Sequence, residues 1–465
     1  MKFKTIIEPF KIKMVEPILM STEEMRVQYL KDAHYNTFLL SSDQVIIDLL
    51  TDSGTSAMSN TQWSGMMLGD ESYAGASSWF KLEKSIRDLT GMPYVLPTHQ
   101  GRAAERILYG TIGRKGKTFI SNTHFDTTRA NIEFSGAEAI DIPVKIENSN
   151  AHFRGDLDVV LLKELIKLKG AENIAAVILT VTNNSGGGQP VSMKNAKEVS
   201  EICKSNQILL IMDGCRIAEN SYFVKHYEPA YRDYSYRDIA IELCTLADGF
   251  VMSAKKDGMV NMGGFLALRN QELADACKNL LIITEGFTTY GGLSGRDMEA
   301  LAVGLVEVFH PDYLHYRIIS TTYLGEHLDK LGVPVILPVG GHAVYIDAAK
   351  MYPHIPLDEY PGQALVGEMY RVGGVRSVEV GSVMFGKYDE FGKLIPAARE
   401  LVRLALPRRV YTQSHLDYVI EVFEYLVKNK DKVRGYKITK ETKFLRHFTA
   451  HFEPLQNEMV EQGVI

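Results

Sequence analysis

Gly249-Phe-Val-Met-Ser-Ala-Lys-Lys-Asp-Gly258 joins a short apolar run to a pair of lysines. The run 249–252 predicts a buried strand, so Lys255 and Lys256 are expected where the end of a strand meets a site. An ammonium group buried without a partner costs roughly several kcal/mol and tends to lose its proton. A neutral amine is the form that Schiff-base chemistry requires. Two solvated charges at a strand end are the alternative for this segment.

Similar apolar runs recur along the middle of the chain and alternate with amphipathic segments such as 156–169 and 192–205. The seven runs are 94–98, 118–122, 137–144, 175–182, 208–213, 249–256 and 264–269. Apolar strands separated by helices predict a largely parallel sheet that is covered on both faces. In such sheets ligands bind at the carboxyl ends of the strands.

The chain of 465 residues is long enough for two domains. A long helical region is expected from about residue 295 to 330. A second pattern follows, with strands at 343–347, 375–380 and 401–406 and helices at 363–372 and 413–428. The first 50 residues hold too few strands for a core of their own. We therefore predict a large α/β domain over 51–311 and a smaller α/β domain built from 1–50 and 312–465.

The composition is that of an ordinary soluble enzyme, with 45% hydrophobic and 23% charged residues. The net charge of −6 gives no electrostatic support for nucleic-acid binding. Widely spaced cysteines argue against a zinc site or a disulfide framework and suit a reducing cytoplasm; they are Cys203, Cys215, Cys244 and Cys277. The sequence shows neither a signal peptide nor an apolar stretch of roughly 20 residues. We expect a cytoplasmic protein without nucleic-acid or membrane partners.

Polar and aromatic residues follow several of the predicted strands. Gln100-Gly-Arg102 stands before a helix start, where free N–H groups and a guanidinium group make a seat for a phosphate. Phe125 and Asp126 follow the run 118–122; for these two alone, a packed ring and a helix cap are the favoured interpretation. Asn184 opens a loop with three glycines, which would let a ligand approach the backbone closely.

The next strands add charged groups to the same edge. Asp213 ends the run 208–213, and a carboxylate there needs a cationic partner. Ser253 and Lys256 follow on the next run. A phosphate seat, an aromatic ring, an asparagine, an aspartate, a serine and a lysine together meet the needs of pyridoxal phosphate (PLP), with Asp213 keeping the ring nitrogen protonated. The sequence lacks GxGxxG after a strand and GxxxxGK[ST], which argues against a nicotinamide cofactor and a P-loop.

Over almost its full length the sequence resembles the β-eliminating lyases, the family of the tryptophanases and the tyrosine phenol-lyases. Six stretches carry the resemblance, in the family's order. They are Asp48-Leu-Leu-Thr-Asp-Ser-Gly54, Gly69-Asp-Glu-Ser-Tyr-Ala-Gly75, Pro97-Thr-His-Gln-Gly-Arg102, Gly187-Gly-Gln-Pro-Val-Ser192, Ser253-Ala-Lys-Lys-Asp257 and Pro407-Arg-Arg-Val-Tyr-Thr412. The departures are Gly214-Cys215 before Arg216 and Arg129-Ala-Asn131.

The resemblance implies the PLP-dependent transferase-like fold (fold type I) with Lys256 as the Schiff-base residue. It assigns the remaining cofactor contacts to the phosphate, the ring and the phenolic oxygen. The phosphate ligands would be Gln100, Gly101, Arg102 and Ser253, the ring partners Phe125 and Asp213, and the residues at the phenolic oxygen Asn184 and Arg216.

Roles toward the substrate are implied in the same way. Arg403 would bind the substrate carboxylate, which suits the geometry of guanidinium. Tyr73 would be the general acid for the leaving carbon, with Lys255 as its basic neighbour. A monovalent cation, K⁺, would be held by Glu71 and by the backbone oxygens of Gly54 and Asn261. The resemblance also implies a homotetramer in which Tyr73 reaches into a neighbour's site.

Three positions resemble tryptophanases rather than tyrosine phenol-lyases: Asp126, Val380 and His447. Asp126 and His447 suit an indole N–H, and Val380 replaces an arginine that would pair with a phenolate. Candidates to wall the indole pocket are Phe38, Phe287, Val380 and Phe448, for which ordinary core packing is an equally good interpretation. Thr51 is a further substrate-binding candidate. The implied reaction converts L-tryptophan and water to indole, pyruvate and ammonia. A tyrosine phenol-lyase, an aminotransferase and a non-catalytic cofactor-binding protein are the alternatives.

Overall fold

The computed structural model describes residues 5–145, 151–184, 186–442 and 445–455. Within these residues the main sheet has seven strands in the order β2-β8-β7-β6-β5-β3-β4. β8 is antiparallel to its neighbours β2 and β7, and the other neighbours are parallel. The predicted seven-stranded, mostly parallel sheet is thereby confirmed. The strands are β2 (Tyr94–Thr98), β3 (Thr118–Ser121), β4 (Glu138–Asp141), β5 (Ile174–Thr180), β6 (Leu210–Asp213), β7 (Gly249–Ser253) and β8 (Gly264–Leu268).

Alternate residues of these strands enter two separate apolar cores, one on each face of the main sheet. Met212 and Met252 belong to one core, and Ile211 and Val251 to the other. Both faces are covered by helices, as the sequence predicts. One face carries α3 (Ser77–Thr90), α6 (Val159–Lys169), α7 (Met193–Ser205), α8 (Ile217–Tyr227), α9 (Tyr236–Thr245) and α11 (Gly295–Glu307), and the other α4 (Gly101–Ile112), α5 (Asp126–Phe134) and α10 (Gln271–Thr284).

The chain reverses its direction of travel across the main sheet between β3 and β5. β4 lies on the outer side of β3, whereas β5, β6 and β7 follow one another on the other side. Such a reversal opens a crevice at the carboxyl ends of the strands, which is where ligands of open α/β sheets bind. Most of the predicted cofactor residues follow β3, β5, β6 and β7, so the topology directs them to this crevice; Gln100, Gly101 and Arg102 follow β2.

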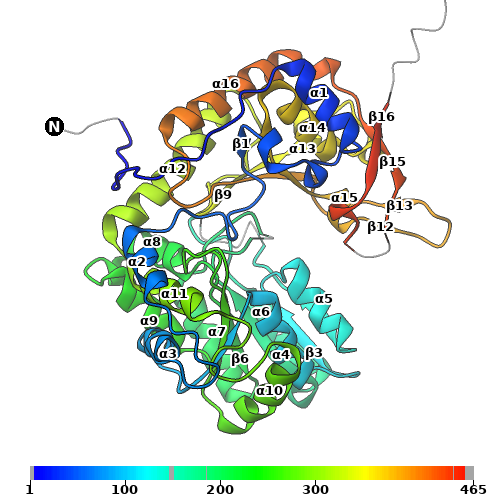
Figure 1. The fold of residues 1–465 in the computed structure, drawn as a ribbon. Helices are drawn as coiled ribbons and strands as arrows, with labels where there is room; N and C mark the ends of the chain where they lie inside the picture. The colour runs from blue at the N-terminus through cyan, green and yellow to red at the C-terminus, as the bar shows by residue number, and fades with distance from the viewer. Residues whose placement is uncertain (1–4, 146–150, 185, 443–444, 456–465) are drawn as a thin grey trace, which may run out of the picture.

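A smaller part with its own core lies above the main sheet in Figure 1. β9 (Ala343–Asp347), β14 (Leu401–Ala405) and β11 (Val378–Val380) form an antiparallel sheet. The N-terminal segment contributes β1 (Ile47–Asp48), which pairs in parallel with β10 (Val375–Arg376). The predicted domain boundaries stay a prediction.

Helices surround this smaller part and join it to the main sheet. α12 connects the two, and Figure 1 shows α16 and α14 near the top of the molecule. The remaining elements are α1 (Glu23–Asp32), α2 (Asn60–Met67), α12 (Pro311–Lys330), α13 (Ala348–Met351), α14 (Pro361–Gly373), α15 (Ser382–Phe385), α16 (Gln413–Asn429), β12 (Lys387–Tyr388), β13 (Leu394–Ile395), β15 (Tyr436–Lys440) and β16 (His451–Pro454). No helix in the described ranges has the length and apolar character needed to cross a membrane.

Three predicted strands differ clearly from those observed. The run 137–144 is a strand only over Glu138–Asp141. The run 249–256 is a strand only to Ser253, because pairing with β8 ends at Ser253 and Gly264. The run 375–380 is divided into β10 and β11, which pair in different sheets on either side of Ser377. An apolar pattern does not reveal such a change of partner, because both short strands bury their side chains.

Candidate active site

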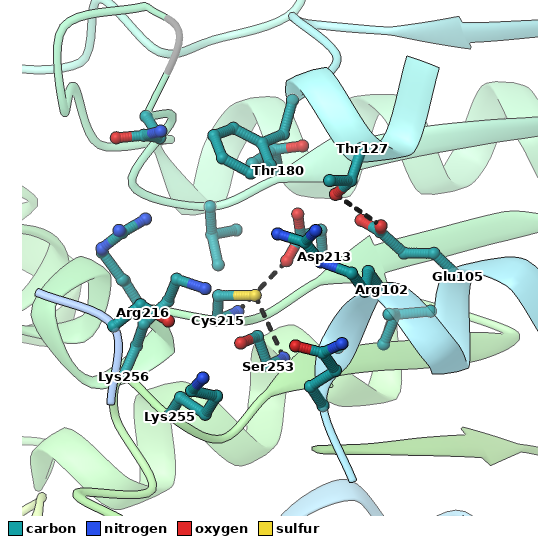
Figure 2. A pocket seen from close by; sticks show the side chains of 17 residues that line it. Arg102, Glu105, Thr127, Thr180, Asp213, Cys215, Arg216, Ser253, Lys255 and Lys256 are labelled. Atoms are coloured by element: carbon teal, nitrogen blue, oxygen red, sulfur yellow. Dashed lines mark hydrogen bonds between the residues drawn. The ribbon is translucent and has the colours of Figure 1, made fainter. Parts of the chain in front are cut away.

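A pocket lies at the carboxyl ends of the main-sheet strands and holds about 700 Å³ of empty space, counting its open mouth. The nine residues that the resemblance assigns to the cofactor all line it, and so does Lys255. Figure 2 shows Arg216, Lys255 and Lys256 on one side of the pocket and Glu105 on the other, with Cys215 and Asp213 between them.

The N-terminus of α4 forms one wall of the pocket. α4 begins at Gly101, two residues earlier than the sequence predicts, with Gln100 as its N-cap. A Cβ atom on Gly101 would lie 2.5 Å from Cβ of Ser253 and 2.8 Å from its backbone nitrogen. Glycine is therefore needed here for close packing of α4 on the end of β7. The free N–H groups of this first turn point to an anion site.

Asp213 ends β6 and is buried, with 7% of its surface exposed. Its Oδ1 accepts a hydrogen bond from the Cys215 N–H at 3.2 Å, and the Cys215 Sγ accepts one from the Ser253 N–H at the same distance. These contacts tie the end of β6 to the end of β7. Asp213 thus presents a carboxylate from a fixed position in the pocket wall.

Glu105 and Asp126 place two more carboxyl groups near Asp213. The Thr127 hydroxyl donates to Glu105 Oε2 at 2.8 Å, and the Thr128 hydroxyl donates to Oε1. Burial, and next to it the charge of Asp213, raises the pKa of Glu105 to about 7. Burial also raises the pKa of Asp126, against the opposing effect of Arg102, Arg403 and Lys256. The hydrogen bonds from Thr127 and Thr128 to Glu105 join α5 to α4 at the pocket.

Asn184, after β5, is the centre of a polar cluster between the two parts of the molecule. Its Oδ1 accepts from His342 Nε2 at 2.9 Å, from the Tyr345 hydroxyl at 2.8 Å and from Arg403 Nη1 at 3.0 Å. Burial holds the pKa of His342 well below its usual range, followed by the charge of Arg216. His342 is therefore neutral, and Asn184 keeps its amide group available for a further partner.

Positive charge accumulates around the pocket. Within the described ranges, no carboxylate forms an ion pair with Arg102, Lys255, Lys256 or Arg403. The Arg403 guanidinium donates instead to Asn184 and to the carbonyl of Leu50 at 3.0 Å. Burial lowers the pKa of Lys255, and the charges of Lys256 and Arg102 lower it further. The pocket therefore suits an anionic ligand.

Behind the pocket, six buried side chains form a charge-balanced network of three arginines and three acids. Arg216 binds Asp52 through two bonds, at 2.7 and 2.9 Å. Arg408 binds Asp52 at 3.0 Å, Glu219 at 2.9 Å and Asp257 at 2.8 Å, and Arg317 binds Glu219 at 3.0 Å. Because Asp257 directly follows Lys256, the network fixes the backbone that carries the lysine.

Several residues predicted for the substrate lie on the smaller part. Phe38 contacts both His447 and Phe448, with ring centroids 5.8 and 4.9 Å apart. His447 is buried, and burial lowers its pKa to about 4 with a further contribution from Arg403. Val380 lies on β11, whose pairing with β14 sets Val378 opposite Arg403. The structure brings these residues together around Arg403.

Other predicted residues lie apart from the pocket within one chain. Tyr73 is 70% exposed and its ring stacks on Phe287 at 5.8 Å. Glu71 accepts from the Gly295 N–H at 2.9 Å and pairs with Arg296 at 3.1 Å, so it caps α11. Gly54 and Asn261 do meet, because Asn261 Nδ2 donates to the Gly54 carbonyl at 2.9 Å.

Thr51 belongs to a short turn beside the pocket. Its Oγ1 accepts from the Ser53 N–H at 3.1 Å, and Ser53 lines the pocket. Thr51 also follows Leu50, whose carbonyl accepts from Arg403 at 3.0 Å. The turn thus links the N-terminal segment to Arg403.

The sequence suggests that the glycine loop after Asn184 approaches a ligand. In the structure this loop packs instead against Gly340 and His342. Gly187 and Gly188 adopt positive φ values of 92° and 71°. A Cβ atom on Gly340 would lie 2.4 Å from the Gly188 carbonyl oxygen, and one on Gly188 would lie 3.2 Å from His342. These glycines allow close contact between two segments of the chain.

Sequence reasoning missed Glu105, Cys215, His342 and Tyr345 as site residues. Cys215 lies two residues after Asp213, and His342 directly precedes the predicted strand 343–347, so these positions were the available signal. Glu105 and Tyr345 gave no such signal, because Glu105 lies inside a helix and Tyr345 inside a buried strand.

The geometry can now be compared with known proteins. The family model described as Beta-eliminating lyase matches residues 48–422. The tryptophanase of Salinibacter ruber is 54% identical over 98% of this chain and 97% of its own length. The tryptophanase of Hyphomonas neptunium is 52% identical over 97% of this chain and all of its own. The tyrosine phenol-lyase of Pasteurella multocida is 46% identical over 96% and 98%.

Solved structures of lower identity share the fold. Threonine aldolase from Leishmania major superposes with a TM-score of 0.57 at 17% identity, covering 82% of this chain and 99% of that chain. Serine palmitoyltransferase from S. paucimobilis with bound PLP–myriocin gives 0.57 at 13% identity, covering 83% and 88%. The predicted fold type I is confirmed. With the full-length match to the curated relatives, the chain belongs to the β-eliminating lyase family.

Proposed function

We propose that this enzyme is a PLP-dependent tryptophan indole-lyase that converts L-tryptophan and water to indole, pyruvate and ammonia. One observation carries the proposal: Lys256, Asp213 and the N-terminus of α4 line a single pocket at the switch point of the sheet. The near-full-length identity of 52–54% to two tryptophanases supports the choice of L-tryptophan.

The pocket fits PLP by its own chemistry. Gln100, Gly101, Arg102 and Ser253 offer N–H, guanidinium and hydroxyl donors for the phosphate group, and the glycine permits the close approach of α4 to β7. Asp213 offers a buried carboxylate for the ring nitrogen. In this proposal Phe125 packs on the ring, while the Asn184 amide and Arg216 lie at its phenolic oxygen.

The chain's own groups bind the substrate and move its protons. When bound, PLP supplies an aldehyde that condenses with amines and a ring that withdraws electrons from the substrate Cα. Lys256 holds its amine in the pocket and takes the Cα proton as general base. Lys255, with its lowered pKa, stands beside it. Arg403 binds the substrate carboxylate. Its guanidinium forms no ion pair within the described residues, so its charge is available for this contact.

Breaking the bond between Cβ and the indole C3 requires a proton at C3, which we assign to Tyr73. Its 70% exposure supports a role in the pocket of a neighbouring subunit, since it lies outside the pocket of its own chain. We assign the indole N–H to Asp126 and His447; His447 Nδ1 is buried without a hydrogen-bond partner in the described part of the chain. The remaining substrate contacts in this proposal are Thr51, Phe38, Val380 and Phe448.

A homotetramer, a cytoplasmic location and a K⁺ site complete the proposal. Exposed apolar side chains near Tyr73 and in the N-terminal segment support contacts between copies; they include Ile7, Val15, Met67 and Leu68, which are 69–84% exposed. We assign K⁺ to Glu71 and to the carbonyls of Gly54 and Asn261. The contact between Gly54 and Asn261 supports two of these ligands.

A substrate panel tests the function. The purified enzyme with PLP, supplied with no keto acid, should release indole and pyruvate from L-tryptophan, faster with K⁺ than with Na⁺. Lys256→Ala should lose this turnover because the base is missing. Phenol from L-tyrosine with negligible indole would make the enzyme a tyrosine phenol-lyase, and a requirement for an acceptor keto acid would make it an aminotransferase.

A further inference from the structure

Two carboxyl groups are buried together next to the strand that carries Val380. Glu379 lies in the middle of β11 and Glu400 directly precedes β14, and they are 4% and 3% exposed. Because side chains alternate along a strand, Glu379 lies on the opposite face of the sheet from Val378 and Val380. Val378 pairs with Arg403 on the neighbouring strand, so these two side chains share a face. Glu379 therefore lies on the face of the sheet opposite to Arg403.

Both carboxyl groups bind the backbone that directly follows Val380. Glu379 Oε1 accepts from the Val383 N–H at 3.0 Å, and Oε2 accepts from the Met384 N–H at 3.1 Å. Glu400 Oε2 accepts from the Ser382 N–H at 3.2 Å, and the Ser382 hydroxyl donates to Oε1. The pair therefore holds the turn from β11 into α15 by four hydrogen bonds.

Gly381 lets the two groups come close to each other. A Cβ atom at Gly381 would lie 2.6 Å from Glu379 Oε1 and 2.6 Å from Glu400 Oε2. Any side chain at this position would push the carboxyl groups apart. The packing of the two acids thus depends on the residue that follows Val380.

Within the described residues, no cation forms an ion pair with either acid. Arg446 binds the same turn: its guanidinium donates to the carbonyls of Ser382, Val383 and Gly386 and pairs with Glu441 at 2.8 Å. Asp347, at the end of β9, adds negative charge near Glu400. The residue of α14 that packs against Glu379 is Gly362, which carries no charge.

Burial, and next to it the charge of Glu400, raises the pKa of Glu379 to about 8. Burial and Asp347 also raise the pKa of Glu400, although hydrogen bonds from Ser382 oppose this. Two negative charges in so small a volume repel each other, so the pair keeps a proton at neutral pH.

We propose that Glu379 and Glu400 are positioning residues that share one negative charge, hold Val380 and Arg403 in place for the substrate, and release this segment when both ionise. The proposal rests on the proposed function, in which Val380 and Arg403 contact the substrate. Its consequence is weaker substrate binding in alkaline solution without a comparable change in the chemical step.

Two glutamine variants separate this role from a merely structural one. In Glu400→Gln the amide oxygen accepts from the Ser382 N–H and the NH₂ group donates to the Ser382 hydroxyl, which can reverse its role. This variant keeps the contacts and removes the second charge. In Glu379→Gln an NH₂ group faces a backbone N–H, which cannot accept a hydrogen bond, so one contact is lost at every pH.

The decisive measurement is the pH dependence of KM for L-tryptophan in the PLP-loaded enzymes. Between about pH 7 and pH 9, KM of the wild type should rise about threefold relative to Glu400→Gln, with a constant kcat ratio. Glu379→Gln should have a raised KM throughout. Glu421→Gln, an exposed glutamate on α16, should follow the wild type. Parallel KM profiles of the wild type and Glu400→Gln would overturn the proposal.

Unfolding without substrate gives a second readout that does not depend on activity. The folded wild type keeps a proton that the unfolded chain loses above about pH 4.5, so its free energy of unfolding should fall as pH rises from about 4.5 to 8. In Glu400→Gln this fall should be smaller, because Glu379 ionises more readily. Equal slopes contradict the shared charge. If the wild type releases no indole, the proposed function is contradicted instead. The unfolding experiment would still show whether Glu379 and Glu400 share one charge.

Discussion

At the scale of single residues, Glu105 is a buried acid whose charge depends on its surroundings. Its pKa of about 7 means that the folded protein binds a proton that the unfolded chain has lost above about pH 4.5. The free energy of unfolding of the cofactor-free protein should therefore decrease between about pH 4.5 and 7. We predict that Glu105→Gln removes up to about 3 kcal/mol of this decrease, as measured by urea unfolding at several pH values.

The glutamine at position 105 can keep both contacts, because the hydroxyls of Thr127 and Thr128 can donate or accept. Glu164→Gln, at an exposed position of α6, is the matched control and should leave the slope of stability against pH unchanged. If Glu105→Gln and Glu164→Gln gave the same slope as the wild type, Glu105 would be ionised in the folded state.

The cofactor residues that the strand pattern alone could indicate share one property: they follow an apolar run. Asp213 and Lys256 could be placed because the end of a buried strand is a recognisable position. Glu105 lies inside α4, where a charged residue normally faces solvent, and nothing in its own neighbourhood predicts burial. Its location follows from the packing of α5 on α4, which depends on residues more than 20 positions away.

At the scale of elements, the junction of α4 and β7 depends on the missing side chain of Gly101. A Cβ atom there would lie 2.5 Å from Cβ of Ser253 and 2.8 Å from its backbone nitrogen, so α4 or the end of β7 must shift. We predict that Gly101→Ala weakens PLP binding at least about tenfold, because the donors at this helix start lose their alignment. Spectroscopic titration of the cofactor-free protein with PLP measures the effect.

Gly110 provides a control in the same helix. A Cβ atom there would lie 3.3 Å from a methyl group of Leu280, a flexible side chain that can move. Gly110→Ala should therefore keep the affinity for PLP and change stability by about 1 kcal/mol or less, since alanine favours helix. Equal affinities of the two variants would mean that α4 does not need close contact with β7.

Most elements of the main sheet were predictable because their strands are apolar runs of ordinary length, with helices between all but β7 and β8. The smaller part was less so. Ser377 separates β10 from β11. β10 pairs with β1 from the N-terminal segment, whereas β11 pairs with β14, which follows it in the sequence. The local sequence does not show which partner each strand takes, because tertiary packing sets that choice.

At the scale of the whole molecule, Arg408 joins segments from throughout the chain. It is fully buried and contacts Asp52 from the N-terminal segment, Glu219 of α8 and Asp257 after Lys256. No periodicity in the sequence predicts such a network, because its members are up to 356 positions apart. What the sequence did show is the stretch Pro407-Arg-Arg-Val-Tyr-Thr412 as part of the family resemblance, without a structural reason for it.

Replacing Arg408 with methionine tests whether the network holds the parts of the molecule together. Arg408→Met removes one of three buried arginines and leaves three carboxylates with two partners, so we expect a loss of about 3–5 kcal/mol in the free energy of unfolding. Lys437→Met is the control, because its ion pair with Glu453 is exposed and should contribute less than about 1 kcal/mol. Urea unfolding of both variants measures the difference.

Because Asp257 adjoins Lys256, the affinity for PLP should also fall in Arg408→Met and stay unchanged in Lys437→Met. A loss below about 1 kcal/mol in Arg408→Met would show that the three acids take up protons or water at little cost, and that packing alone joins the two parts.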